Sequence, residues 1–398
     1  MNIDFKSASH ALRLYSGSQA LASLPAEIKR QKAERAFIVC GRTVSRKTPL
    51  IAKIRDLLGG RCAGVFDEID KDSTLRSVMA ATAAARASGA DMIIAVGGGS
   101  VIQAARVVLM VLAENQPPER LMTQYPEGRA AVSPKLLAPK LPVINVLTLP
   151  TAAQNRGGSA VRGDGMDHRM EFFDPKTRPR AVFWDSDALL TAAPELARSS
   201  GCTIYWRAVM NLGWVGVNPL IEGGRIHTVK LAARALSALD PVNPAPRVEL
   251  CAAALLLNRD ADDGGQGGER HWVARVTYAF ATALLVSYPA VRHGEAFAAL
   301  TGSMLRQLGE RDAHAMSNLA VNLGVASDRT AAPAIAVADH LDGFFSSLGM
   351  PVRLRELEIP RAGLDEIMQH ALKNFNADPQ REFLREREFL YQVLQQAW

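Results

Sequence analysis

The sequence is poor in cysteine and in aromatic residues, and it lacks any long apolar stretch. Its four cysteines occur singly, without the paired spacing of a zinc site or a disulfide framework, so a reducing cytoplasm is the expected compartment. Aromatic residues make up only 6% of the chain and the net charge of +6 is spread along it, which argues against nucleic-acid binding. No segment approaches the roughly 20 apolar residues of a membrane-spanning helix, and the first residues do not resemble a signal peptide, so no membrane attachment is expected.

What the sequence does have is enough apolar residues for two cores, since 48% of its 398 residues are hydrophobic. The candidate strands are the short apolar runs at 36–40, 62–66, 92–96, 143–147 and 181–184. Segments with helical periodicity lie between the first three of these runs, and this alternation of strand and helix predicts a parallel sheet with right-handed crossovers. Beyond Asp187 the helical periodicity continues almost to the end. We therefore predict an α/β domain over 1–187 and an all-helical domain over 188–398.

A glycine-rich turn follows the run at 92–96. It consists of Gly97, Gly98, Gly99 and Ser100, directly before a helical pattern. Glycines let a pyrophosphate approach the backbone, the start of a helix presents unpaired N–H groups, and Ser100 adds a hydroxyl. The alternative is a strand-to-helix turn that needs glycine only for positive φ. Because three consecutive glycines cost conformational entropy on folding, phosphate binding is the favoured interpretation.

This turn and the helix after it resemble the GGGSxxDxAK motif of the iron-containing alcohol dehydrogenase superfamily, which has a dehydroquinate synthase-like fold. Gln103 and Arg106 stand at the motif's Asp and Lys positions, so the polar contacts there are expected to differ from those of typical members. The resemblance extends over nearly the whole chain. It implies a dinucleotide-binding α/β domain, a helical domain that completes an active-site cleft, and a homodimer.

Two further segments bear on the cofactor. The segment from Leu149 is similar to the family's PTTAGTGSE signature, and the resemblance assigns cofactor contacts to Thr151 and Asn155, although both residues are also common in ordinary turns. The family's first strand often ends in an Asp that binds the ribose hydroxyls of NAD, whereas here Gly41 is followed by Arg42. A guanidinium in place of that carboxylate suits a ribose 2′-phosphate. The resemblance therefore favours NADP(H) over NAD(H), and a solvated helix start is the alternative.

The family's metal site is largely missing. Members usually bind a divalent ion through a DALxHxxE pattern and two later histidines, and the i, i+4 spacing places the first two ligands on one helix face. At the corresponding positions this chain has Thr203, Arg207, Ala279 and His293. A guanidinium cannot coordinate a cation, so metal binding is not expected.

The resemblance gives catalytic roles to two of these residues. Arg207 carries a permanent charge and several donors, so it would polarise a carbonyl or bind a substrate carboxylate, or it would only pair with a carboxylate such as Glu295. His293 would relay the hydroxyl proton, or it would only cap a helix beginning at Gly294. His271 is a weaker candidate for the same proton transfer.

The implied function is that of a metal-independent NAD(P)H-dependent oxidoreductase. It would transfer hydride between the nicotinamide and a small aldehyde, ketone or oxoacid, including anionic ones. A maleylacetate reductase-like enzyme is one alternative, and a non-catalytic nucleotide-binding or partner-binding descendant of the fold is another. Cyclases with the dehydroquinate synthase architecture depend on the missing metal ligands, which counts against them.

Overall fold

The computed structural model describes residues 2–126, 129–166, 168–265, 271–325 and 332–398. The strands are β1 (Arg13–Gly17), β2 (Ala36–Cys40), β3 (Cys62–Phe66), β4 (Met92–Gly97), β5 (Val143–Leu147), β6 (Gly158–Arg162), β7 (Arg169–Phe173) and β8 (Ala181–Asp185). The helices before β8 are α1 (Leu24–Arg30), α2 (Arg42–Lys47), α3 (Leu50–Leu58), α4 (Leu75–Ala87), α5 (Gly99–Glu114) and α6 (Pro118–Leu121). Those after it are α7 (Ser186–Leu190), α8 (Pro194–Gly213), α9 (Glu222–Ser237), α10 (Ala245–Asp262), α11 (Trp272–Ser287), α12 (His293–Leu308), α13 (Ala313–Asn322), α14 (Pro333–Ser347), α15 (Leu364–Ala371) and α16 (Arg387–Gln396).

The main sheet has six parallel strands in the order β1-β8-β5-β4-β2-β3. Five of them coincide with the predicted apolar runs, while β1 and the antiparallel pair β6–β7 were not predicted. The chain steps from β2 outward to β3 and then crosses back to β4 on the other side of β2. This reversal creates a switch point between β2 and β4, where ligands of open α/β sheets bind beyond the carboxyl ends of the strands.

Both faces of the sheet are covered, which explains why its strands are continuous apolar runs. Ile38 and Ile94 belong to the core cluster that contains residues of α1 and α3. Their neighbours Phe37 and Ile93 point to the other side and pack with residues of α4 and α5. Alternate side chains of each strand are thus buried in two different cores.

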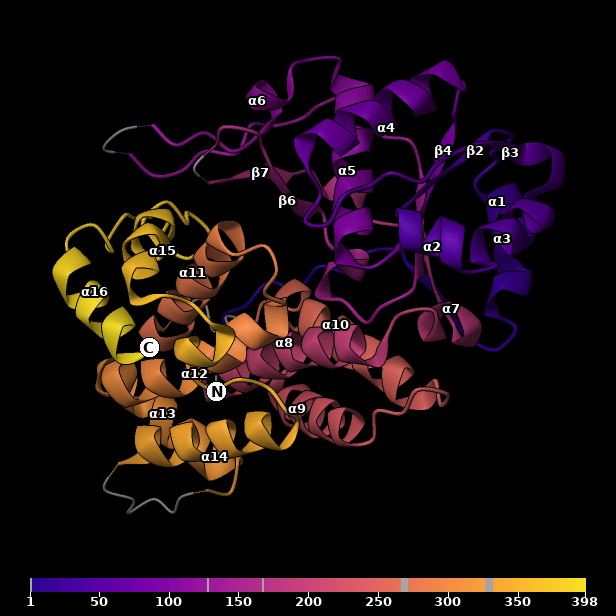
Figure 1. Cartoon of the computed structure of the whole chain (residues 1–398). Helices are drawn as coiled ribbons and strands as arrows, with labels where there is room; N and C mark the ends of the chain where they lie inside the picture. The colour runs from indigo at the N-terminus through magenta and orange to yellow at the C-terminus, as the bar shows by residue number, and fades with distance from the viewer. Residues whose placement is uncertain (1, 127–128, 167, 266–270, 326–331) are drawn as a thin grey trace.

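The part of the chain after β8 is mostly helical, as predicted, and lies beside the α/β domain (Figure 1). Helix α8 packs against α9, α10, α12 and α13 at its centre. Helix α10 also reaches the α/β domain, because Cys251 and Leu255 join the core around α5. The division at residue 187 stays a prediction.

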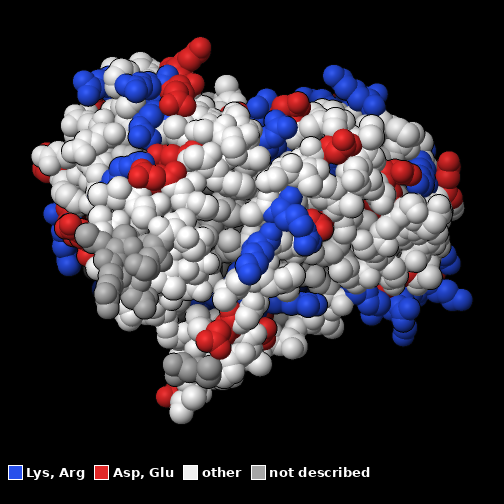
Figure 2. All heavy atoms as spheres, turned by 90° about the horizontal axis from the view of Figure 1, so that it is seen from below, with Lys and Arg blue, Asp and Glu red and all other residues white. Residues whose placement is uncertain are grey.

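The surface matches the even spread of charge in the sequence. On the face drawn in Figure 2, Lys and Arg side chains are mixed with acidic and uncharged ones. Among the residues that the structure describes, no helix is both long enough and apolar enough to span a membrane.

Candidate functional site

The glycine turn lies at the switch point of the sheet. Strand β4 ends at Gly97 and the 16-residue helix α5 begins at Gly99, with Gly98 as its N-cap residue. None of the three glycines has positive φ, so the alternative explanation of the triplet is wrong. Close packing disfavours a larger residue at these positions, most strongly at Gly97. An added Cβ would lie 2.6 Å from Val101 at Gly97, 3.3 Å from Leu149 at Gly98 and 3.2 Å from Thr151 Oγ1 at Gly99.

Gly41 directly follows β2, which ends at Cys40, and is the N-cap residue of α2. The guanidinium of Arg42 lies 3.4 Å from Glu68 Oε1, and Arg46 lies 3.4 Å from both Asp67 and Glu68. These two carboxylates follow β3, so acidic and basic groups both border this side of the switch point. Binding of a ribose 2′-phosphate by Arg42 stays a prediction.

The segment after β5 contains Thr151 and Asn155, the two residues there with predicted cofactor contacts. Thr151 Oγ1 accepts a hydrogen bond from Ala153 N and caps the short 3₁₀ helix η3 (Ala152–Asn155). Asn155 is only 7% exposed, and its side-chain oxygen accepts a hydrogen bond from Asn258 of α10. Asn155 therefore joins the two parts of the molecule, and its cofactor contact stays a prediction.

Ser100 connects the glycine turn to a strained loop. Its Oγ accepts a hydrogen bond from Asp72 N at 3.1 Å, and its carbonyl oxygen accepts one from Ser73 Oγ at 2.6 Å. Asp72 and Ser73 both have positive φ, at 62° and 55°, which is rare for two consecutive non-glycine residues. The two hydrogen bonds that Ser100 accepts offset that strain and fix the direction of the Asp72 side chain.

Asp72 brings His293 and Arg169 together. Its Oδ1 lies 3.7 Å from His293 Nε2 and 3.5 Å from the Arg169 guanidinium. Burial alone would raise the pKa of Asp72, but His293 and Arg169 outweigh it and hold the pKa below its ordinary value. The carboxylate is thus ionised at neutral pH and orients both side chains. His293 remains 44% exposed at the first position of α12.

Arg169 and Glu171 face the same side of β7 because side chains alternate along a strand. Met170 and Phe172, between and beyond them, are buried in the core under α5. The β6–β7 pair is attached to α5 through Gln103, whose Oε1 accepts a hydrogen bond from Ala160 N, and through Arg106, which donates to Gly158 O. The two residues that depart from the family motif therefore support this pair of strands.

Glu171 links β7 to the C-terminal segment. Its carboxylate accepts hydrogen bonds from Tyr125 OH at 3.1 Å and from Asn376 Nδ2 at 2.5 Å. Burial raises the pKa of Glu171 to about 7, although Tyr125 and Arg169 act in the opposite direction. Figure 1 shows β6 and β7 above α11 and α15, so this contact spans the junction between the α/β domain and the helical part.

Tyr278 lies on α11 opposite these groups. Burial raises the pKa of its phenol, and Glu171 raises it further, while Arg169, Arg207 and Arg156 lower it. The hydroxyl makes no hydrogen bond to any residue that the structure describes. We refer to Asp72, Arg169, Glu171, Arg207, Tyr278 and His293 as the junction cluster.

Arg207 enters the cluster from α8. Ser199, Thr203 and Arg207 follow at intervals of four, so they share one face of the helix. Ser199 Oγ accepts a hydrogen bond from Gly294 N at 2.9 Å, which places the start of α12 against this face. An added Cβ at Gly294 would lie 2.2 Å from Ser199 O, so only glycine permits the approach.

The structure bears on the alternative roles of His293 and Arg207 and on the candidate His271. Helix α12 begins at His293 with Arg292 as its N-cap residue, so His293 is not the cap of a helix that begins at Gly294, and that alternative is wrong. Glu295, the suggested partner of Arg207, forms an ion pair with Arg292 at 2.9 Å. His271 is fully buried, and its Nε2 lies 3.1 Å from Met210 O, as in a structural residue.

The residues that the resemblance places at the family's metal positions do not fit a divalent cation. Thr203 Oγ1 donates to Ser199 O, Arg207 is itself a cation, and Ala279 has no donor atom. Within the described ranges, no three His, Cys, Asp or Glu side chains are grouped as a metal ion would require.

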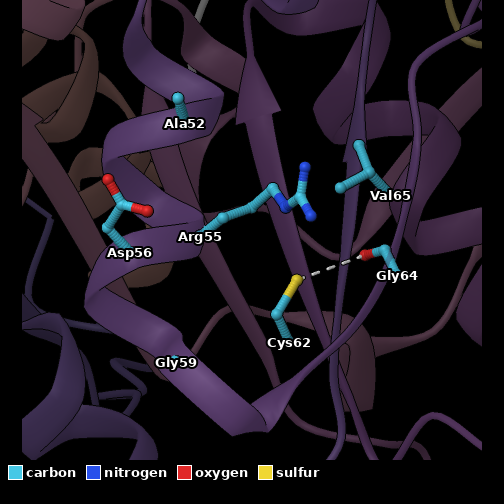
Figure 3. A pocket seen from close by; sticks show the side chains of 7 residues that line it. All are labelled: Ala52, Arg55, Asp56, Gly59, Cys62, Gly64 and Val65. Carbon is cyan, nitrogen blue, oxygen red and sulfur yellow. Dashed lines mark hydrogen bonds between the residues drawn. The ribbon is translucent and has the colours of Figure 1, made fainter.

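A separate cavity of about 580 Å³ lies against α3 and the beginning of β3 (Figure 3). Arg55 and Cys62 are among its lining residues. It lies at the amino end of β3, whereas the glycine turns lie at the carboxyl ends of their strands, so it is not part of the candidate site.

Comparisons with known proteins bear on both parts of the chain. The family model described as "Iron-containing alcohol dehydrogenase" matches residues 11–186, and "Fe-containing alcohol dehydrogenase family, C-terminal" matches residues 274–398. Lactaldehyde reductase from Escherichia coli is 24% identical over 223 residues, which is 55% of this chain and 56% of that enzyme. Maleylacetate reductase 2 from Cupriavidus pinatubonensis is 26% identical over 209 residues, 52% of this chain and 49% of that enzyme. The alignments thus span about half the length of these relatives.

Among solved structures, a variant of an archaeal halo-thermophilic alcohol dehydrogenase from a Red Sea brine pool superposes with a TM-score of 0.85. The superposition covers 100% of both chains at 19% sequence identity. At this identity the agreement concerns the fold alone, and it includes both the α/β domain and the helical part.

Proposed function

The chain belongs to the iron-containing alcohol dehydrogenase family, and we propose that it is a NAD(P)H-dependent oxidoreductase that works without the family's metal ion. Its substrate would be a small aldehyde, ketone or oxoacid, or the corresponding alcohol. The observation that carries the proposal is the position of Arg207, a permanent cation on the face of α8 that packs against the start of α12.

The residues support a division of labour. A bound nicotinamide cofactor would supply or accept hydride. The glycine turn, with Ser100 and the start of α5, would bind its pyrophosphate. Arg207 would donate hydrogen bonds to the substrate oxygen and stabilise the negative charge that develops there during reduction. His293, oriented by Asp72, would give a proton to that oxygen, or take one in the oxidative direction.

The test combines activity with a chelator. The purified protein would be supplied with NADPH or NADH and a panel of small aldehydes, ketones and oxoacids, with and without excess EDTA. The proposal expects reduction of at least one carbonyl compound at the same rate in both conditions. Loss of activity in EDTA, restored by a divalent ion, would overturn the proposed metal independence.

Two alternatives remain distinguishable. The maleylacetate reductase relative supports reduction of a carbon–carbon double bond in an anionic substrate, which a panel of unsaturated diacids would reveal. A non-catalytic descendant of the fold would bind the nucleotide and reduce none of the compounds. The intact glycine turn supports nucleotide binding in either case.

We further propose a homodimer in the cytoplasm, with domains over 1–187 and 188–398. The family supports the dimer. All four cysteines are free thiols, which supports a reducing compartment. Light scattering of the purified protein tests the dimer directly.

A further inference from the structure

The junction cluster gathers positive charge. Its members Arg169 of β7 and Arg207 of α8 act on the Tyr278 phenol, and so does Arg156, which follows η3 and lies outside the cluster as defined. Two carboxylates, Asp72 and Glu171, lie among them. Glu171 accepts hydrogen bonds from Tyr125 and Asn376 and so already has two neutral donors.

Arg169 has donor capacity that its described neighbours do not use. Its only ion-pair partner in the described ranges is Asp72, at 3.5 Å, and Asp72 also faces His293. Its Nε is buried and has no hydrogen-bond acceptor there. A buried guanidinium nitrogen without an acceptor is costly, and a ligand oxygen would remove that cost.

Tyr278, on α11, supplies a second donor from the helical side of the junction, and Arg169 acts electrostatically on its phenol. Its hydroxyl makes no hydrogen bond within the described residues, and burial keeps it protonated. A protonated phenol from α11 and a guanidinium from β7 would present donors from two sides, a pattern that suits a planar carboxylate.

We propose that the substrate carries a carboxylate in addition to its reacting carbonyl, and that Arg169 and Tyr278 bind this carboxylate. This inference rests on the proposed oxidoreductase function and narrows its substrate class to small carbonyl acids. A neutral substrate would leave the Arg169 Nε without an acceptor. A phosphate dianion would be repelled more strongly by Asp72 and Glu171 than a single carboxylate.

The first arm of the test measures binding without turnover. Succinate and 1,4-butanediol, which have the same number of carbons, would be titrated by calorimetry into the protein saturated with NADPH, which can reduce neither compound. Succinate should bind at least tenfold more tightly than the diol, because hydrogen bonds to charged groups exceed neutral ones. Equal affinity for the two compounds, or binding of neither, would overturn the proposal.

Variants assign the effect to residues. Arg169→Gln should weaken succinate binding about tenfold or more, and Arg169→Lys should restore only part of it because lysine lacks the planar fork. Arg86→Gln, on the exposed end of α4, is the matched control and should bind succinate like the wild type. Unchanged binding in Arg169→Gln would overturn the assignment. If Arg169→Gln does not fold, Tyr278→Phe decides, with a several-fold loss expected and no loss contradicting.

The second arm separates this inference from the function on which it rests. Succinic semialdehyde and butanal differ only in the terminal carboxylate, and the proposal expects at least a tenfold higher kcat/KM for the semialdehyde. Preference for butanal would contradict the inference while the oxidoreductase function stands. Binding of succinate without reduction of any carbonyl compound would contradict the function while the carboxylate site stands.

Discussion

The glycine turn and the opposing helices α8 and α11 differ in how much of the family pattern they retain. The turn has all three glycines and Ser100; an added Cβ would clash with Val101 at Gly97 and would lie tightly against Leu149 at Gly98 and Thr151 at Gly99. On the helices, a hydroxyl, a guanidinium and a methyl group occupy the positions that the resemblance gives to metal ligands, and α8 and α12 approach closely at Gly294. A fold can thus keep a strand-turn-helix frame while the side chains of the facing helices change.

The two regions are nevertheless connected. Ser100 of the turn holds the loop that carries Asp72, and Asp72 faces His293 at the start of α12. Lys71 in the same loop donates a hydrogen bond to Pro289 O of the helical part. The glycine turn therefore positions Asp72 and, through it, His293 at the start of α12.

The largest effect is expected on the helical side. Arg207→Ala should lower kcat about 100-fold or more, because it removes the donor for the developing negative charge, while the dissociation constant for NADPH stays unchanged. Steady-state kinetics and nicotinamide fluorescence measure the two quantities. Arg86→Gln is the control, and near-normal turnover in Arg207→Ala would end the proposed role.

The stability of the protein should depend on pH through Glu171, which joins β7 of the α/β domain to Asn376 of the C-terminal segment. Its pKa of about 7 in the folded protein exceeds the ordinary 4.5, so the folded state binds the proton more tightly. The free energy of unfolding should therefore fall as the pH rises from about 4.5 to 7, by on the order of 3 kcal/mol. Glu171→Gln should lack this decline in urea denaturation at pH 5 and pH 8. Equal declines in both proteins would show that Glu171 is not responsible.

On the turn side, Gly97→Ala should cost about 1–3 kcal/mol of stability and weaken nucleotide binding, because the new Cβ would lie 2.6 Å from Val101. Gly60→Ala is the matched control, since nothing lies within 4 Å of its added Cβ. Urea denaturation and an NADPH titration of both variants measure the difference. A Gly97→Ala protein as stable as Gly60→Ala would refute the packing argument.

The smallest effect is expected at the exposed arginines after β2. Arg42 and Arg46 each pair with carboxylates at 3.4 Å, so replacing both by Gln should raise the dissociation constant for NADPH only several-fold. The dissociation constant for NADH should stay the same. An equal change for both nucleotides would remove the argument for a 2′-phosphate contact, and Glu68→Gln is the opposite-sign control.

The sequence predicted the strands that are buried on both faces, because runs such as 36–40 and 92–96 are continuously apolar. It missed β1, an edge strand in which Arg13 and Ser16 interrupt the pattern, and it missed β6 and β7, which bury only alternate residues. The alternation of polar and apolar residues from Arg169 to Phe172 was the available signal.

The candidate site was predictable only where a local motif carried it. Gly97 to Ser100 form one continuous turn, so their arrangement follows from neighbouring residues. The position of the Asp72 side chain depends on the positive-φ pair Asp72 and Ser73, which hydrogen bonds to Ser100 hold in place. The Glu171 carboxylate is held by two donors far apart along the chain, Tyr125 and Asn376. Contacts between segments so distant along the chain are set by tertiary packing, which no local pattern reveals.

The most direct test of the central claim is metal analysis of the purified protein together with NADPH and NADH titrations followed by nicotinamide fluorescence. The account predicts negligible metal and saturable binding of at least one of the two nucleotides. Stoichiometric metal in the active protein, or no binding of either nucleotide, would contradict it.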